Sequence, residues 1–105
     1  MTRPATLVTF VFPSALGRWA GDMVELRVFA VADHDGGRPT LGAALDTLCR
    51  THPSLERRIR DDHGRVRRHI SMFVCGENAR GLGGLACALP PAAEVHLLPV
   101  LSRVP

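Results

Sequence analysis

Apolar and polar residues alternate over residues 6–12 and again over residues 23–29. Such alternation is typical of strands that bury one face, because successive side chains of a strand point to opposite sides. The apolar positions on one face are Val8, Phe10 and Phe12 in the first stretch, and Val24, Leu26 and Val28 in the second. Pro13 ends the first stretch, since proline has no N–H to donate to a strand ladder. The pattern therefore predicts a hairpin of two strands joined by residues 13–21.

The next stretch has the period of an amphipathic helix. Its apolar positions, spaced i, i+3, i+4 and i+7, are Leu41, Ala44, Leu45 and Leu48. Thr40 precedes this stripe and is a suitable N-terminal cap. Pro53 ends the helix, because the residue before a proline is pushed out of the helical region. Ser54 is then predicted to cap a second short helix over residues 55–60, and residues 61–64 are predicted to form a turn.

Alternation returns over residues 69–75 and 94–100, which predicts two more strands. The side chains expected to face inward are Ile70, Met72, Val74, Val95 and Leu97, and those expected to face outward are His69, Ser71, Phe73, Cys75, His96 and Leu98. A hairpin, helices and two later strands predict an α+β fold of two layers. We expect a single domain over residues 1–105, with a flexible tail from about residue 101.

Composition narrows the classes of function. The chain has 105 residues, of which 46% are hydrophobic, enough for one core. Its 13 basic residues are all arginine, but the net charge is only +3, and the chain has one Trp and no Tyr. We therefore expect no nucleic-acid partner, since neither a dense basic stripe nor a stacking platform is present. No apolar run approaches the ~20 residues of a membrane span, and no signal peptide is evident, so no membrane partner and a cytoplasmic location are expected.

The three cysteines, Cys49, Cys75 and Cys87, are widely spaced and include no CxxC pair. Their number is odd, so we expect free thiols that are buried or half-buried. We expect no metal, because zinc ligands usually come in short paired spacings, and we expect no cofactor. His69 lies too far from Cys75 along one strand to reach it. A pair of Cys75 and His96 across neighbouring strands remains a geometric option for thiol–imidazole chemistry.

Four segments resemble, in order, motifs of the MoaD/ThiS sulfur-carrier family. Residues 40–42 resemble the TLG start of its helix, and residues 69–77, HISMFVCGE, resemble the strand and turn HVNVFVNGE. Residues 78–85, NARGLGGL, resemble DVRFLGGL, and residues 91–99, PAAEVHLLP, resemble DGDEVSILP. The similarity extends over about residues 6–99. Each motif alone is weak, whereas the ordered set is specific.

The resemblance implies a ubiquitin-like β-grasp fold, with a mixed sheet of four to five strands packed on one main helix. It also implies a carrier that performs no turnover of its own. In this family an E1-like activating enzyme adenylates a C-terminal Gly-Gly, which becomes a thiocarboxylate. The thiocarboxylate delivers sulfur to a metabolite held by a biosynthetic enzyme. The expected partners are therefore proteins, and the chain is expected to be a carrier or binding protein rather than an enzyme.

The C-terminal residues of this sequence differ from that motif. Arg103 and Val104 stand where the two glycines are expected, and Pro105 follows them. Glycine reaches backbone conformations that other residues do not, so an activating enzyme built for Gly-Gly is expected to reject this ending. Gly83 and Gly84 precede the last predicted strand, and cleavage there would remove core residues.

Three interpretations of this ending stay open. The chain has lost carrier activity and kept partner binding, or it is a shortened form of a longer protein. Alternatively, the fold has another role, since fold does not determine function. That role would be a small-molecule-binding or catalytic protein of secondary metabolism, or a regulatory or scaffold subunit.

Two surfaces are candidates for contact with a partner. The first is an apolar patch on the outward face of the sheet, which would bind a partner protein or a second copy of the chain in a homo-oligomer. Its residues are Phe73, His96, Leu98 and Val100. The second is a basic surface around the turn at residues 61–64, which would either dock an acidic partner or be solvated and balanced by Asp61 and Asp62. Its residues are Arg57, Arg58, Arg60, Arg65, Arg67 and Arg68.

Overall fold

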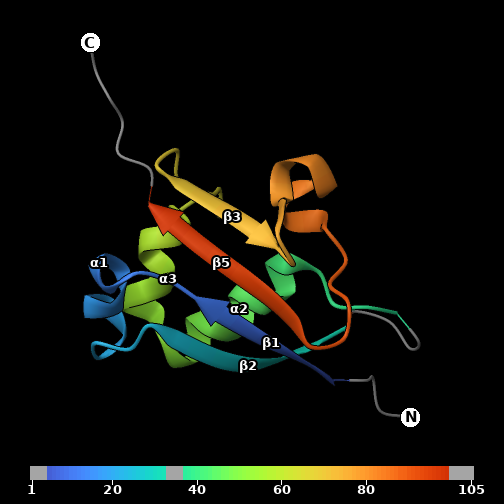
Figure 1. Cartoon of the computed structure of the whole chain (residues 1–105), viewed down its shortest axis with the longest axis horizontal. Coiled ribbons are helices and arrows are strands. Elements are labelled where there is room, and N and C mark those ends of the chain that lie inside the picture. Colours follow the sequence, from blue (N-terminus) through green and yellow to red (C-terminus); the bar gives the residue numbers. More distant parts are fainter. Residues whose placement is uncertain (1–4, 33–36, 100–105) are drawn as a thin grey trace.

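A five-stranded mixed sheet with the strand order β2-β1-β5-β3-β4 forms one layer of the computed structural model, and helices cover one of its faces (Figure 1). The structure describes residues 5–32 and 37–99. The strands are β1 (Ala5–Val11), β2 (Glu25–Val31), β3 (Ile70–Val74), β4 (Glu77–Asn78) and β5 (Ala93–Pro99). The helices are α1 (Ser14–Gly17), α2 (Leu41–Thr51) and α3 (Pro53–Ile59), with 3₁₀ turns η1 (Arg18–Ala20), η2 (Ala79–Leu82) and η3 (Gly84–Ala86).

The first and last strands lie side by side in the middle of the sheet. β1 pairs antiparallel with β2, as the hairpin prediction required, and parallel with β5. β5 in turn pairs antiparallel with β3. The inward positions predicted from alternation are buried in both central strands, and Val8, Phe10, Val95 and Leu97 are fully inaccessible to solvent. The predicted α+β architecture with a mixed sheet is therefore confirmed.

The second strand begins at Glu25, two residues later than the alternation predicted, and runs to Val31. Val24, predicted to face inward, is 52% exposed. The connection from Pro13 is not an open turn but the helical segments α1 and η1, which bury Leu16 and Ala20. A Cβ atom at Gly17 would lie 2.3 Å from the carbonyl oxygen of Met23, so the loop folds back closely on itself there. Because Gly17 packs closely against Met23, residue 23 belongs to the loop, and the strand begins after it at Glu25.

The main helix, α2, begins where its cap was predicted. The Oγ1 atom of Thr40 accepts a hydrogen bond from the N–H of Ala43 at 3.1 Å, which satisfies one of the free donors of the first turn. The four apolar positions of the stripe are all fully buried against the sheet. The second helix was predicted over residues 55–60, and its start was predicted two residues too late. Helix α3 begins at Pro53, not after Ser54, because proline is favoured in a first helical turn; its N-cap residue is His52, which makes no side-chain cap hydrogen bond.

A buried carboxylate joins the two helices. Glu56 of α3 is 8% exposed and pairs with Arg60, whose Nη2 atom also donates to Asp46 of α2 at 2.8 Å. Burial of a charged group lowers stability unless the group is paired, and the pairing of Glu56 with Arg60 offsets this loss. Arg60 is thus turned away from the basic surface on which the sequence placed it. No helix in the described part of the chain is long and apolar enough to cross a membrane.

Candidate protein-contact site

The outer face of β3 and β5 lies opposite the helices (Figure 1). It carries three of the side chains that the sequence predicted to share one apolar patch. Phe73 and His96 are direct cross-strand partners, and Leu98 is the partner of Ser71. Their neighbours in each strand, among them Met72 and Leu97, are buried on the inner face. Because strand side chains alternate, Phe73, His96 and Leu98 must share the outer face.

These side chains surround an open depression of about 370 Å³. Its lining residues are Phe73, Cys75, Gly76, Glu94, His96 and Leu98. Phe73 is half-buried and Leu98 is 43% exposed, so the walls include apolar surface that nothing in the described residues covers. A single exposed apolar residue needs no explanation, but an aromatic and a leucine around one hollow are typical of a contact site.

A hydrogen-bonded pair of polar side chains lies at the edge of the depression. The Nε2 atom of His96 and the Oε1 atom of Glu94 are 2.7 Å apart, and both residues project from β5 on the same face. The carboxylate fixes the orientation of the imidazole ring over the hollow. Glu94 was not among the residues selected from the sequence. Its position two residues before His96 in an alternating strand was the signal that would have found it.

The turn between β3 and β4 sets the position of Cys75. Cys75 and Gly76 both have positive φ, 49° and 88°, which is the backbone of a two-residue hairpin turn. This turn brings Cys75 to the exposed tip of the hairpin, so the prediction that the thiols would be buried or half-buried is wrong for this one. Cys49 is half-buried and Cys87 is buried.

Thiol alkylation is expected to distinguish these cysteines. Burial raises the pKa of both Cys49 and Cys87, with Glu56 adding to the effect at Cys49 and Cys75 at Cys87. Since the thiolate is the nucleophile, iodoacetamide at neutral pH should modify the folded chain once, at Cys75. Intact-mass spectrometry with peptide mapping measures this, and the Cys75→Ser variant should remain unmodified. Fast modification of Cys87 in the folded protein would contradict the expected order.

The arginines of the basic surface differ in their surroundings. The guanidinium of Arg58 lies 3.8 Å from the centre of the Trp19 ring, a cation–π contact that holds it over η1. The Nε atom of Arg67 donates to the carbonyl of Arg57 at 2.9 Å. Asp61 accepts the backbone N–H groups of Arg65 and His63, and these bonds lower the pKa of its carboxyl group. Asp61 therefore organises the turn that presents Arg65, Arg67 and Arg68.

Several residues named from the sequence do not enter this site. Val100, Arg103, Val104 and Pro105 lie outside the described residues. His69 does not line the depression, whereas Cys75 and His96 both do. Within residues 5–32 and 37–99, no group of three or more His, Cys, Asp or Glu side chains could hold a metal ion.

The sheet order and the helix across it define a ubiquitin-like β-grasp protein. SAMP1 from Haloferax volcanii shares the fold with a TM-score of 0.71 and 33% sequence identity, over 93% of this chain and 99% of that one. CysO from Mycobacterium tuberculosis, described as an antigen, has a TM-score of 0.71 and 29% identity, over 90% and 99% of the two chains. This chain therefore belongs to the ubiquitin-like β-grasp family of MoaD/ThiS-type sulfur carriers, as its motifs predicted.

A third solved structure adds evidence for the fold alone. It is the Amycolatopsis orientalis BexX/CysO complex, with a TM-score of 0.72 and 21% identity, over 92% of this chain and 99% of that one. The sequence matches no protein-family model and no curated protein.

Proposed function

We propose that this member of the sulfur-carrier family acts by binding a partner protein through the outer face of β3 and β5. The observation that carries the proposal is the apolar depression around Phe73, His96 and Leu98. The partner is an E1-like activating enzyme or a biosynthetic enzyme of a sulfur-transfer pathway. A CysO with the same fold has been solved in a complex with BexX, which supports a role through protein contact.

The depression has the composition of an interface centre. Energetically dominant interface residues are often aromatic and sit in pockets that exclude water, with polar groups at the rim. Phe73 and Leu98 supply the apolar centre, and the Glu94–His96 pair supplies the polar rim. A partner without complementary polar groups would leave the carboxylate of Glu94 and the imidazole of His96 without partners in the interface. The pair would therefore contribute to the specificity of binding.

The basic surface would assist the same association. Arg57 and Arg58 on α3, with Arg65, Arg67 and Arg68 after it, give this part of the molecule an excess of positive charge. Such a surface speeds encounter with an acidic partner, and its effect falls as salt screens it. We place the protein in the cytoplasm, since its three free thiols suit a reducing compartment.

Replacing Phe73 with Asp tests the proposal. The substitution puts a charge into the apolar depression, which should weaken binding to a cognate E1-like or biosynthetic enzyme by about 30-fold or more, the effect of losing one dominant contact. Titration calorimetry with the purified enzyme from the same organism measures the change. Size-exclusion chromatography of both forms of the chain reports any homo-oligomer that uses the same face.

Phe29→Asp is the matched control. Phe29 is 65% exposed on the same outer face, but on β2, three strands away from β3. This variant introduces the same charge and should bind nearly as the wild type does. If Phe73→Asp binds with unchanged affinity, or if both variants lose binding equally, the depression is not the contact site.

A second candidate function is supported by the polar residues of the depression. Cys75, Glu94 and His96 gather there, and a volume of about 370 Å³ falls within the range of small-molecule sites. A repurposed binding or catalytic protein would depend on these three side chains. Cys75→Ser separates the candidates, because partner binding that survives this change but not Phe73→Asp assigns the face to protein contact.

A further inference from the structure

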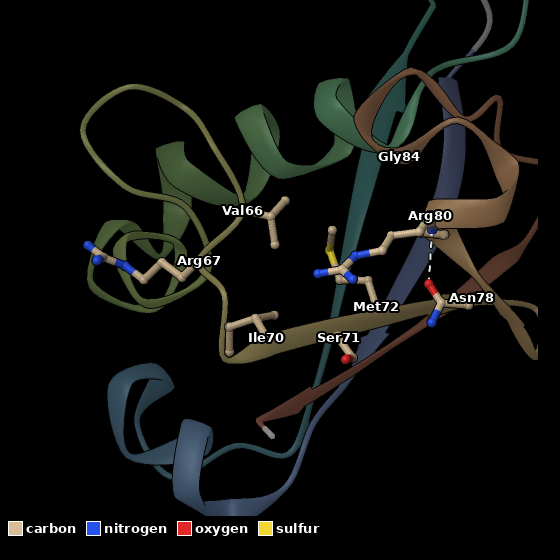
Figure 2. A pocket seen from close by; sticks show the side chains of 9 residues that line it. Val66, Arg67, Ile70, Ser71, Met72, Asn78, Arg80 and Gly84 are labelled. Atoms are coloured by element: carbon tan, nitrogen blue, oxygen red, sulfur yellow. Dashed lines mark hydrogen bonds between the residues drawn. The ribbon is translucent and has the colours of Figure 1, made fainter. Parts of the chain in front are cut away.

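A second, smaller cavity lies at the opposite edge of β3, away from β5 (Figure 2). Its volume is about 160 Å³, and it is more enclosed than the depression on the outer face. The residues that line it are Val66, Arg67, Ile70, Ser71, Met72, Asn78, Ala79, Arg80 and Gly84. None of them belongs to the depression around Phe73, so the two cavities are separate sites.

The floor of this cavity is apolar. Ile70, Met72 and Ala79 are each at most 6% exposed and belong to the core, and Val66 packs against the same core. An apolar floor provides no partner for a polar ligand, so the polar groups at the wall must decide what binds.

Arg80 provides one of those polar groups. Figure 2 shows its side chain reaching from η2 across the cavity towards Val66 and Met72. Its backbone N–H is held by the Oδ1 atom of Asn78 at 3.0 Å, which anchors the residue at the start of η2. No carboxylate within the described residues forms an ion pair with the Arg80 guanidinium. Its donors are therefore available to an anion that enters the cavity.

The edge of β3 provides a second donor. The N–H of Cys75 donates to the carbonyl of Glu94 on β5. Because antiparallel hydrogen bonds alternate, the N–H of Met72 points away from β5, towards this cavity. Strand β4 has two residues, and its pairing with β3 ends at Phe73 and Asn78. The Met72 N–H therefore has no strand partner at this edge.

We propose that this cavity binds one acidic side chain of a partner polypeptide. The carboxylate would accept hydrogen bonds from the Arg80 guanidinium. The adjoining backbone of the partner would accept a hydrogen bond from the N–H of Met72, which lies between the Ile70 N–H that donates to Arg67 and the pairing of Phe73 with β4. The size of the cavity favours a single side chain, since sites for whole small-molecule ligands usually begin at about 300 Å³. Hydrogen bonding between the backbone of a bound peptide and an unpaired backbone group of a strand is a recurring mode of peptide recognition. Arg65 and Arg68 flank the lining residues 66–67 in the sequence, and their positive charge favours an acidic segment.

A blocked pentapeptide, acetyl-Thr-Val-Glu-Val-Thr-amide, is the probe, titrated into the ¹⁵N-labelled full chain by NMR. We expect shifts of the amide signals of Met72 and Arg80. We expect the Glu peptide to bind about tenfold or more tightly than the same peptide with Gln, because the charged hydrogen bond is lost. Sodium acetate serves as the second arm, and it should bind much more weakly, since it lacks the peptide backbone that would pair with the N–H of Met72.

Arg80→Gln should abolish the preference for Glu over Gln. Arg50→Gln is the matched control, because Arg50 is exposed in the last turn of α2 and does not line the cavity, so this variant should keep the preference. Equal affinity for the two peptides, a preference that survives Arg80→Gln, acetate binding as strongly as the peptide, or shifts confined to Phe73 and His96 would each overturn the proposal. Absence of any shift at about 10 mM peptide, a concentration at which even weak sites fill, would also overturn it. The outcome is independent of the Phe73→Asp experiment.

Discussion

Replacing Phe10 with alanine is expected to lower the free energy of unfolding by about 3–5 kcal/mol. Phe10 is fully buried in β1, where it is flanked by Leu26 of β2 and Val95 of β5. The substitution removes a large apolar side chain from the centre of the sheet and leaves a cavity that its rigid neighbours cannot fill. Small domains are typically stable by only about 5–15 kcal/mol, so the variant should come close to unfolding at ordinary temperature.

Denaturant titration followed by circular dichroism measures this change. Phe29→Ala is the matched control, because Phe29 lies on the neighbouring strand but is mostly exposed. Its substitution should change the unfolding free energy by less than about 1 kcal/mol. Equal effects of the two substitutions would contradict the assignment of Phe10 to the core and Phe29 to the surface.

The second large effect concerns carrier chemistry. The 105-residue chain, which ends Arg103-Val104-Pro105, is expected to remain unmodified when incubated with an E1-like enzyme, ATP and a sulfide donor. The long side chain of Arg103, the β-branched Val104 and the fixed φ of Pro105 all lack the conformational freedom of Gly-Gly, for which the activating enzyme of this family is expected to be built. A chain with Arg103→Gly and Val104→Gly and without Pro105 should be converted to the thiocarboxylate.

Intact-mass spectrometry detects the conversion as the exchange of one oxygen for one sulfur. The diglycine carrier that is native to the enzyme serves as the positive control, which ensures that the enzyme and donor are active. Conversion of the unaltered chain would show that its ending is competent and would contradict the prediction. A chain that binds the enzyme but is not converted would fit a role through contact alone.

Much of the fold could be predicted because its signals are local. The period of two in β1, β3 and β5 and the period of 3.6 in α2 follow from which side chains must be buried. Thr40 caps α2 as expected, since a cap requires only residues within one turn. The same alternation placed Phe73, His96 and Leu98 on one face before their strands were known to be neighbours.

Other features could not be predicted because they depend on contacts between distant segments. The helical folding of residues 14–20 follows from burial of Leu16 and Ala20 and from the close approach of Gly17 to Met23, and it shifts the start of β2. The boundary of α3 at Pro53 is an exception, because it follows from proline's local preference for a first helical turn, which the prediction of a serine cap at the next residue overlooked. Arg60 does not contribute to the basic surface, because it forms ion pairs with Asp46 of α2 and Glu56 of α3.

The sequence by itself determined four of the five strands, the main helix, most of the faces that they bury and the family to which the chain belongs, whereas β4 was not predicted. The tertiary structure alone decided the order of the strands, and with it the pairing of Phe73 with His96 that forms the depression. It also decided that β4 is too short to cover the edge of β3, which leaves the N–H of Met72 beside Arg80. The reason is physical: periodicity reports the burial of each segment, whereas a site arises from the register between segments, which only the packed sheet establishes.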